Sequence, residues 1–149
     1  MRHILAAVDF SPVSKAIVRE AAALAEAFDA TLTLLHVAAP DPDFVGYAAG
    51  PKTVRDARAD ELRTEHAELQ TLSRALRDRG LAVHALLIQG PSVAKILEEA
   101  ARVGADTIVV GSHGRGMLER ALLGSVSEGV VRGATCPVLV VPAAGVEGD

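Results

Sequence analysis

The sequence is poor in aromatic residues: 3% of its 149 residues are Phe, Tyr or Trp, and Trp is absent. Half of the residues (50%) are nevertheless hydrophobic, so the core has to be built from Ala, Val, Leu and Ile. A chain of this length has room for one domain with a sizeable core. We therefore predict a single domain over residues 1–149.

Three further scarcities narrow the class of protein. The single cysteine, Cys136, excludes an internal disulfide and, without a second cysteine or an evident base, is interpreted as a structural thiol. A net charge of −4 and a pI near 5.7 lack the basic excess of nucleic-acid-binding proteins. No apolar run reaches the ~20 residues of a membrane span, and Asp9 interrupts the amino terminus before a signal peptide's apolar core. We expect a cytoplasmic protein with no nucleic-acid or membrane partner.

Strands and helices are expected to alternate along the chain. Unbroken apolar runs at Ile4–Val8 and Thr31–Val37 are typical of parallel strands buried on both faces. Between them a helix is predicted with Ser11 as its N-cap and Pro12 at its first position. Its sheet-facing residues are predicted to be Ile17, Ala21, Leu24 and Phe28.

The second half of the chain continues the alternation. A long loop is expected over Ala38–Lys52, because no periodicity survives among its prolines and glycines. Later helices are predicted over Thr53–Arg79, from Ser92 to a stop at Gly104, and over Ser125–Arg132; strands are predicted over Leu81–Ile88, Asp106–Val110 and Pro137–Val141. The fold class is thus α/β: a single-domain, open, doubly wound, five-stranded, mostly parallel sheet with four helices.

A glycine-rich stretch from Val109 to Ser125 is the strongest candidate for chemistry. A strand ends at Gly111, the spacing Gly-x2-Gly-x9-Gly-Ser follows, and a helix is expected to begin at Ser125, which with Glu128 has capping-box spacing. Glycines let backbone N–H groups approach a ligand, and a helix N-terminus adds unpaired donors and a positive dipole end. The stretch therefore predicts a phosphate site.

Two other phosphate motifs fit less well. Met117 and Leu118 stand where a P-loop would have Lys and Ser or Thr. The dinucleotide spacing G-x-G-x-x-G is absent, and the glycine stretch follows the fourth strand instead of the first. Scattered histidines lack metal-ligand spacing, and His36, at a strand end, is assigned to packing.

The sequence resembles the universal stress protein family, in its ATP-binding branch. The resemblance rests on the glycine stretch and on Val8-Asp9-Phe10-Ser11, Leu35-His36-Val37 and Cys136-Pro137-Val138-Leu139-Val140-Val141. It covers the chain from about Arg2 to Pro142. It implies a fold similar to the adenine nucleotide alpha hydrolases and a protein that binds ATP with Mg as a homodimer.

The resemblance also implies which residues hold the nucleotide. Adenosine would be held by Ala7, Asp9 and Val37. The ribose and phosphates would be lined by Val110, Gly111, His113, Gly114, Gly124, Ser125, Val126 and Ser127. Arg115 is the only cation within the loop and can neutralise phosphate, and Mg would come with ATP, near Asp9. No metal site built by the protein alone is expected.

Several alternatives stay open at this point. Asp9 either accepts hydrogen bonds from its own turn or contacts ligand, with equal weight, and Ser125 is a helix cap whether or not phosphate binds. The last strand, Pro137–Val141, is expected at a sheet edge, covered by antiparallel pairing with a second copy. The function is expected to be regulatory nucleotide binding with no catalytic residues. A slow ATP hydrolase, a nucleotidyl-transfer enzyme, or a member that binds only protein partners are the alternatives.

Overall fold

The computed structural model describes residues 1–39, 52–112 and 123–142. Within these ranges the chain alternates five strands with four helices. They are β1 (His3–Ala7), α1 (Ser14–Phe28), β2 (Thr31–Ala38), α2 (Lys52–Asp78), β3 (Val83–Gln89), α3 (Ser92–Val103), β4 (Thr107–Gly111), α4 (Ser125–Gly133) and β5 (Val138–Val141). The loop expected over Ala38–Lys52 lies almost wholly outside the described residues.

The strands form one parallel sheet in the order β3-β2-β1-β4-β5. β1 lies at its centre, and Ile4, Leu5 and Ala6 are 0% exposed. This explains the unbroken apolar run in β1, because a central parallel strand is covered on both faces. The predicted fold class is confirmed, and β5 lies at a sheet edge as expected.

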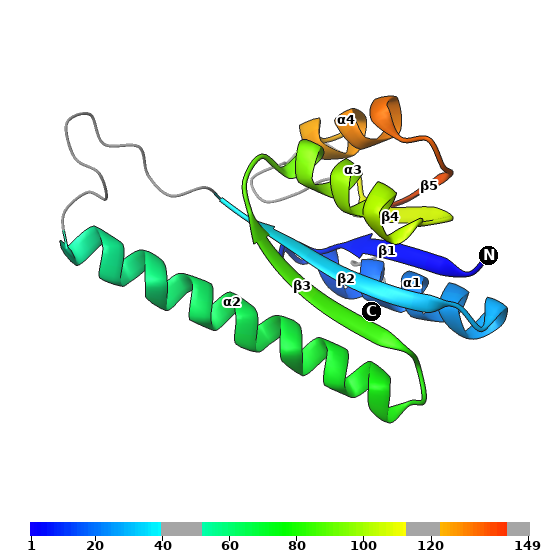
Figure 1. Ribbon diagram of the computed structural model, residues 1–149, viewed down its shortest axis with the longest axis horizontal. Coiled ribbons are helices and arrows are strands. Elements are labelled where there is room, and N and C mark those ends of the chain that lie inside the picture. Colours follow the sequence, from blue (N-terminus) through cyan, green and yellow to red (C-terminus); the bar gives the residue numbers. More distant parts are fainter. Residues whose placement is uncertain (40–51, 113–122, 143–149) are drawn as a thin grey trace.

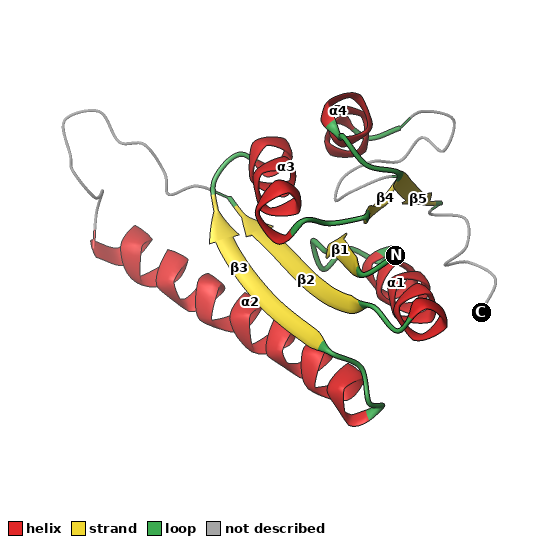
Figure 2. Ribbon diagram, turned by 45° about the vertical axis from the view of Figure 1, so that its right-hand side comes forward, coloured by secondary structure: helices red, strands yellow, loops and turns green. Residues whose placement is uncertain are grey.

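Helices cover both faces of the sheet, as Figures 1 and 2 show: α1 and α2 lie on one face, α3 and α4 on the other. Each face has its own core because successive strand residues point to opposite sides. Ile4 packs in the core under α1 and α2, whereas Leu5 packs in the core under α3 and α4. Complete burial of such a side chain stabilises the fold by about 1.5–3 kcal/mol.

Some of the predictions for the helix ends are confirmed and others are wrong. α3 ends at Gly104 as predicted, with a left-handed backbone (φ 66°) that favours glycine. Phe28, expected to face the sheet, is 51% exposed, so that prediction is wrong. Phe28 is the last residue of α1, where the chain turns at Asp29 into β2, and its side chain meets solvent there. None of the described helices combines the length and apolarity that a membrane span needs.

Close packing of α3 fixes the position of α4. A Cβ atom added at Gly129 would lie 2.7 Å from Cγ2 of Val93, and one added at Gly133 would lie 2.6 Å from Cδ1 of Leu97. Both distances are shorter than carbon atoms tolerate, so the two glycines, one helical turn apart, let α3 approach closely. This contact holds the middle and the carboxyl end of α4 against α3.

Candidate functional site

Two of the strand ends assigned to the ligand are neighbours in the sheet. β1 pairs in parallel with β4, with Ala6 opposite Val109, and with β2 on its other side. The strand order therefore reverses between β1 and β4, and open α/β sheets bind ligands beyond the carboxyl ends at such a point. The predicted site residues on these strands or just after them are Ala7, Asp9, Val37, Val110 and Gly111, all toward this carboxyl end.

Asp9 organises the turn after β1. Its Oδ1 atom accepts hydrogen bonds from the Ser11 backbone N–H (2.9 Å) and the Ser14 hydroxyl (3.2 Å). Phe10, between them, has φ 60°, a conformation that bulky non-glycine residues rarely adopt. Asp9 therefore has the structural role that the sequence left open. A carboxylate has about four lone-pair sites, so these two bonds leave capacity for a ligand.

The predicted start of α1 is wrong. The helix begins at Ser14, and its N-cap residue is Val13, which has no side-chain capping bond. The Ser11 carbonyl accepts the Ser14 N–H (3.0 Å) in a separate turn, so neither Ser11 nor Pro12 has its expected place. The reason is that the Asp9 carboxylate binds the Ser11 N–H first and closes a turn before the helix can start.

The amino terminus of α4 also differs from the capping-box prediction. Gly124 is the N-cap, with no side-chain capping bond, and Ser125 is the first helical residue. Glu128 pairs with Arg132 (2.7 Å) instead of reaching back to the cap. The capping-box prediction is therefore wrong, because the helix starts one residue earlier than expected: Gly124, not Ser125, is the N-cap. Ser125 is exposed, and the first N–H groups of a helix have no partner within the helix itself.

Ser127 has a structural role on the inner side of the same helix. It is 2% exposed, and its hydroxyl donates to the Gly124 carbonyl (2.9 Å) and the Ser112 carbonyl (3.2 Å). Gly124 N–H also donates to Ser112 O (2.7 Å), and Ser112 N–H donates to Val141 O (2.8 Å). These bonds fasten the start of α4 to the ends of β4 and β5. The hydroxyl of Ser127, one of the residues expected to line the ribose and phosphates, already has acceptors within the protein.

Part of the predicted site falls on the glycine stretch that follows β4. His113, Gly114 and Arg115 lie outside the described residues, as does Gly116. Of the glycine motif, the structure describes its first and last parts, Gly111 and Gly124-Ser125. Val126, beside Ser125, is 38% exposed at the start of α4.

A buried pair that the sequence did not single out lies behind the Asp9 turn. His36, assigned to packing, is 4% exposed and packs against Phe10, with ring centroids 4.6 Å apart. Glu65 of α2 reaches the His36 ring. One signal could have revealed this glutamate: it lies between Leu62 and Leu69 at helical spacing, so a charge interrupts the apolar stripe of α2.

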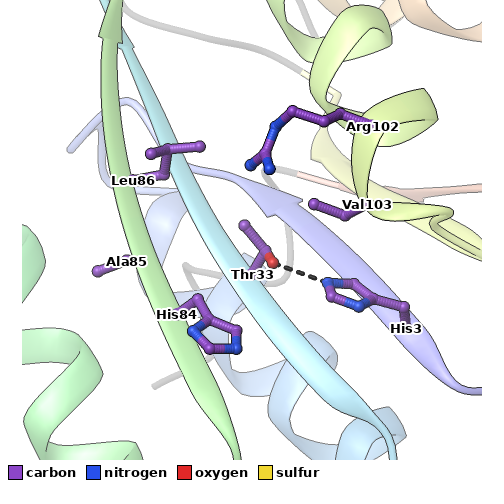
Figure 3. A pocket seen from close by; sticks show the side chains of 7 residues that line it. All are labelled: His3, Thr33, His84, Ala85, Leu86, Arg102 and Val103. Atoms are coloured by element: carbon purple, nitrogen blue, oxygen red, sulfur yellow. Dashed lines mark hydrogen bonds between the residues drawn. The ribbon is translucent and has the colours of Figure 1, made fainter.

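A cavity of about 460 Å³ opens at the other, amino end of the sheet (Figure 3). His3, Thr33, His84 and Arg102 line it, and His3 Nε2 lies 2.8 Å from Thr33 Oγ1. Burial, and to a lesser extent the neighbouring His84 and Arg102, lower the pKa of His3, which keeps this ring uncharged at neutral pH. The Arg102 guanidinium is paired with Glu99 (2.6 Å). Because His3 is uncharged and Arg102 is paired, neither offers the free positive charge that would favour phosphate in this cavity.

Cys136 fits the structural role expected of it. It is half-buried beside the core under α3 and α4, and it is a free thiol. Burial raises the pKa of the Cys136 thiol, so the reactive thiolate is scarce at neutral pH. Within the described ranges no group of three or more His, Cys, Asp or Glu side chains is placed to hold a metal ion.

The fold and these strand ends define a doubly wound α/β domain with a candidate ligand site at its switch point. The sequence profile of the Universal stress protein family matches residues 1–142. The chain belongs to this family. It is 35% identical to universal stress protein MJ0531 of Methanocaldococcus jannaschii over 94% of this chain and 81% of that protein. It is 36% identical to a universal stress protein of Thermus aquaticus over 94% of this chain and 98% of that protein.

Solved structures share the fold along nearly the whole chain. Protein MJ0577 superposes with a TM-score of 0.79 at 26% identity, covering 94% of each chain. UspA of Lactobacillus plantarum superposes with a TM-score of 0.83 at 24% identity, covering 94% of this chain and 97% of that one. A universal stress protein solved in complex with cAMP superposes with a TM-score of 0.64 at 24% identity, covering 95% of this chain and 96% of that one.

Proposed function

We propose that this protein binds ATP, together with Mg²⁺, at the carboxyl end of its sheet and acts as a regulatory nucleotide-binding module. The observation that carries the proposal is the exposed start of α4. Among the described residues no side-chain capping bond is made at its N-cap, Gly124, and the next residue, Ser125, is exposed. A helix N-terminus of this kind attracts phosphate through its N–H donors and its dipole.

The opposite side of the same site fits the rest of the ligand. Val37, near the end of β2, supplies backbone groups for an adenine ring, and Asp9 follows the adjacent strand. A carboxylate is a ligand that Mg²⁺ prefers, usually alongside substrate phosphates. Asp9 would hold the cation that accompanies ATP, while its Oδ1 bonds keep the turn in place.

The solved structures with bound nucleotides do not specify the nucleotide of this chain. The structures solved with cAMP and with dAMP share 24% and 22% identity with this chain, a level that supports the common fold alone. The choice of ATP therefore rests on the glycine spacing and on the resemblance to the ATP-binding branch.

Turnover of ATP is proposed to be negligible. Phosphoryl transfer needs charge neutralisation and a positioned nucleophile or water. The Asp9 Oδ1 atom is bound to its own turn and the Ser127 hydroxyl to backbone carbonyls. Following ADP from purified protein tests this, since turnover near about 1 per second or faster would make the protein an enzyme.

A charge placed at the start of α4 separates ligand binding from folding. In Ser125→Asp the carboxylate would repel phosphate by about 1–4 kcal/mol, depending on the local dielectric. The ATP dissociation constant should then rise by roughly five-fold to several-hundred-fold. The same carboxylate near a helix N-terminus stabilises the helix by about 0.3–1 kcal/mol. The variant should therefore melt at or above the parent temperature.

Ser125→Asn is the matched control, because it has nearly the same shape and no charge. Isothermal titration with MgATP should give near-parental affinity for Asn and strongly weakened affinity for Asp. Parental affinity in Ser125→Asp would contradict a phosphate site at the start of α4. Loss of binding together with a lowered melting temperature would mean that the helix itself had been disturbed.

We also propose a homodimer through β5. Leu139, on this edge strand, is 38% exposed. The carbonyl oxygens of Pro137 and Val141 accept hydrogen bonds from backbone N–H groups in and just after β4. Because backbone direction alternates along a strand, the N–H and C=O groups of Val138 and Val140 point to the open edge of the sheet.

Val140→Pro removes one of these edge N–H groups. It should abolish pairing with a second copy, while the hydrogen bonds between β4 and β5 stay intact. Sedimentation should show a monomer for this variant and a dimer for the parent. A monomeric parent at micromolar concentration would contradict the dimer.

A further inference from the structure

A groove outside the candidate site lies between the start of α1 and the middle of α2. Its volume is about 580 Å³, within the range of about 300–1,000 Å³ that is usual for small-molecule sites. Several α2 residues that line it recur at helical spacing on one face of that helix: Thr64, Ala67, Glu68 and Thr71. Because all of these except Glu68 have short side chains, space remains between the two helices.

Two larger apolar side chains also line the groove. Phe10 comes from the turn after β1 and Leu72 from α2, and both pack against the core under α1 and α2. Each is only partly buried, so some of its apolar surface still meets solvent. A ligand with an apolar body would remove this surface from water, which favours binding.

One hydroxyl at the groove lacks a hydrogen bond. Ser11 lines the groove and is 7% exposed, and its buried Oγ atom has no hydrogen-bond partner among the described residues. A buried hydroxyl without a partner costs free energy. The nearby Ser14 hydroxyl, in contrast, donates to the Asp9 carboxylate (3.2 Å). Because rotation about the Cα–Cβ bond moves Oγ between staggered positions, the Ser11 hydroxyl can donate to an acceptor in the groove.

The end of the groove at α1 carries positive charge. Lys15 lines it from the first turn of α1, is exposed, and makes no ion pair with another residue of the described ranges. The first turn of α1 contains no acidic residue and its N-cap makes no side-chain capping bond, so the helix itself does not offset the positive end of its dipole. Of the nearby carboxylates, Asp9 does not line the groove, and Glu68 lines it from the α2 side.

We propose that this groove is a second ligand site, which binds a small carboxylic acid with an apolar body. The carboxylate accepts a hydrogen bond from the Ser11 hydroxyl and pairs with Lys15, and the apolar body packs on Phe10 and Leu72. Charge complementarity with Lys15 favours an acid over an amine. The inference goes beyond the proposed function and does not depend on it, because no nucleotide takes part.

Octanoate, octanamide and octylamine test the class of ligand, because they share an apolar chain and differ in the charge of the head group. In NMR titrations without nucleotide, octanoate should bind roughly two- to fivefold more tightly than octanamide, which corresponds to one exposed ion pair. The backbone amide signals of Phe10, Lys15 and Leu72 should shift on binding. Octylamine, which Lys15 repels, should bind less tightly than octanoate. The opposite order of acid and amine would overturn the proposal.

Lys15→Met tests the contact with the head group, since methionine keeps much of the side-chain length without the charge. This variant should bind octanoate and octanamide equally. Arg19→Met, an exposed change one turn further along α1 and outside the groove, is the matched control and should keep the parent's preference for octanoate. Glu68→Gln should tighten octanoate binding slightly, because it removes a like charge. A preference for octanoate that survives in Lys15→Met would contradict the pairing with Lys15.

Ala67→Leu tests the location of the site. The larger side chain, at an exposed position of α2, should fill the groove and abolish octanoate binding. Ala75→Leu, which is exposed on the same helix but outside the groove, is the matched control and should bind octanoate like the parent. Parental affinity in Ala67→Leu would overturn the proposal.

Ser11→Ala gives a result that a purely structural role of the hydroxyl would not give. Because this hydroxyl has no partner among the described residues, its removal should leave the melting temperature unchanged or slightly raised, while octanoate binds more weakly. A lowered melting temperature would mean that the hydroxyl already has a partner in the protein, and parental affinity would mean that it does not touch the carboxylate. Either result would contradict the proposal, and this variant decides even if Ala67→Leu does not fold.

Discussion

The two ends of the sheet hold their loops in different ways. At the carboxyl end, buried polar side chains bind backbone carbonyls: His36 binds Val8, and Ser127 binds Ser112 and Gly124. At the amino end, the exposed carboxylate of Asp106 accepts the backbone N–H groups of Arg2 (2.6 Å) and His3 (2.9 Å). The first arrangement is shielded from water, and the second is not.

This difference indicates where the molecule needs a fixed geometry. A buried hydrogen bond resists replacement by water, so it fixes a loop more firmly than an exposed one. The carboxyl end carries Asp9 and the start of α4, which a ligand would require in defined positions. The amino end needs only to join the first strand to the turn before β4. Changes at the carboxyl end should therefore alter both stability and binding, and changes at the amino end stability alone.

The largest combined effect is expected for Ser127→Ala at the carboxyl end. The change removes a buried donor to two carbonyls, and a typical buried hydrogen bond contributes about 1 kcal/mol. For a chain of this size that lowers the melting temperature by about 2–4 °C. ATP affinity should fall as well, because the start of α4 is no longer fastened to Ser112. Calorimetry and titration check the two effects, and unchanged affinity would mean that α4 is held by its α3 contact alone.

A smaller combined effect, confined to stability, is expected for Thr33→Val at the cavity of the amino end. Thr33 is 2% exposed and its Oγ1 lies 2.8 Å from His3 Nε2. Valine keeps the shape, and the half-buried His3 can bond to water instead, so the cost should stay within about 0.5–1.5 kcal/mol. ATP affinity should equal that of the parent. Weakened ATP binding in this variant would contradict the expectation that changes at the amino end of the sheet affect stability alone.

The fold could be predicted from the sequence because several independent local patterns indicate the same strands and helices. The unbroken apolar run of Ile4–Val8 indicates a central strand, and Gly104 indicates a helix end. Neither signal depends on which residues pack against it. These features depend on local periodicity and on the general rules of parallel sheets.

The details of the site could not be predicted in the same way, since they depend on competition between nearby groups. Ser11 and Ser125 each have the right residue type for a helix cap, yet Asp9 captures the Ser11 N–H and Gly124 takes the cap position at α4. Glu65 acquires its role only because α2 crosses β2 at His36, a contact between distant parts of the chain. The hydrophobic periodicity of a helix predicts which face is buried, but it does not predict which side chain of another element that face contacts.

The smallest effect, and the one most sensitive to pH, is expected for Asp106→Asn. The backbone N–H groups of Arg2 and His3 hold the pKa of the Asp106 carboxyl below its ordinary value. A carboxyl with a lowered pKa in the folded state stabilises the fold above its ordinary pKa, and this stabilisation is lost as pH falls through the lowered value. The asparagine keeps an acceptor oxygen but loses the charge. Parent and variant should therefore differ slightly in melting temperature at about pH 7, and the difference should shrink as pH falls below the ordinary pKa of an aspartate. A difference that persists at the lower pH would show that the carboxylate's charge is not what joins Arg2 and His3 to this turn.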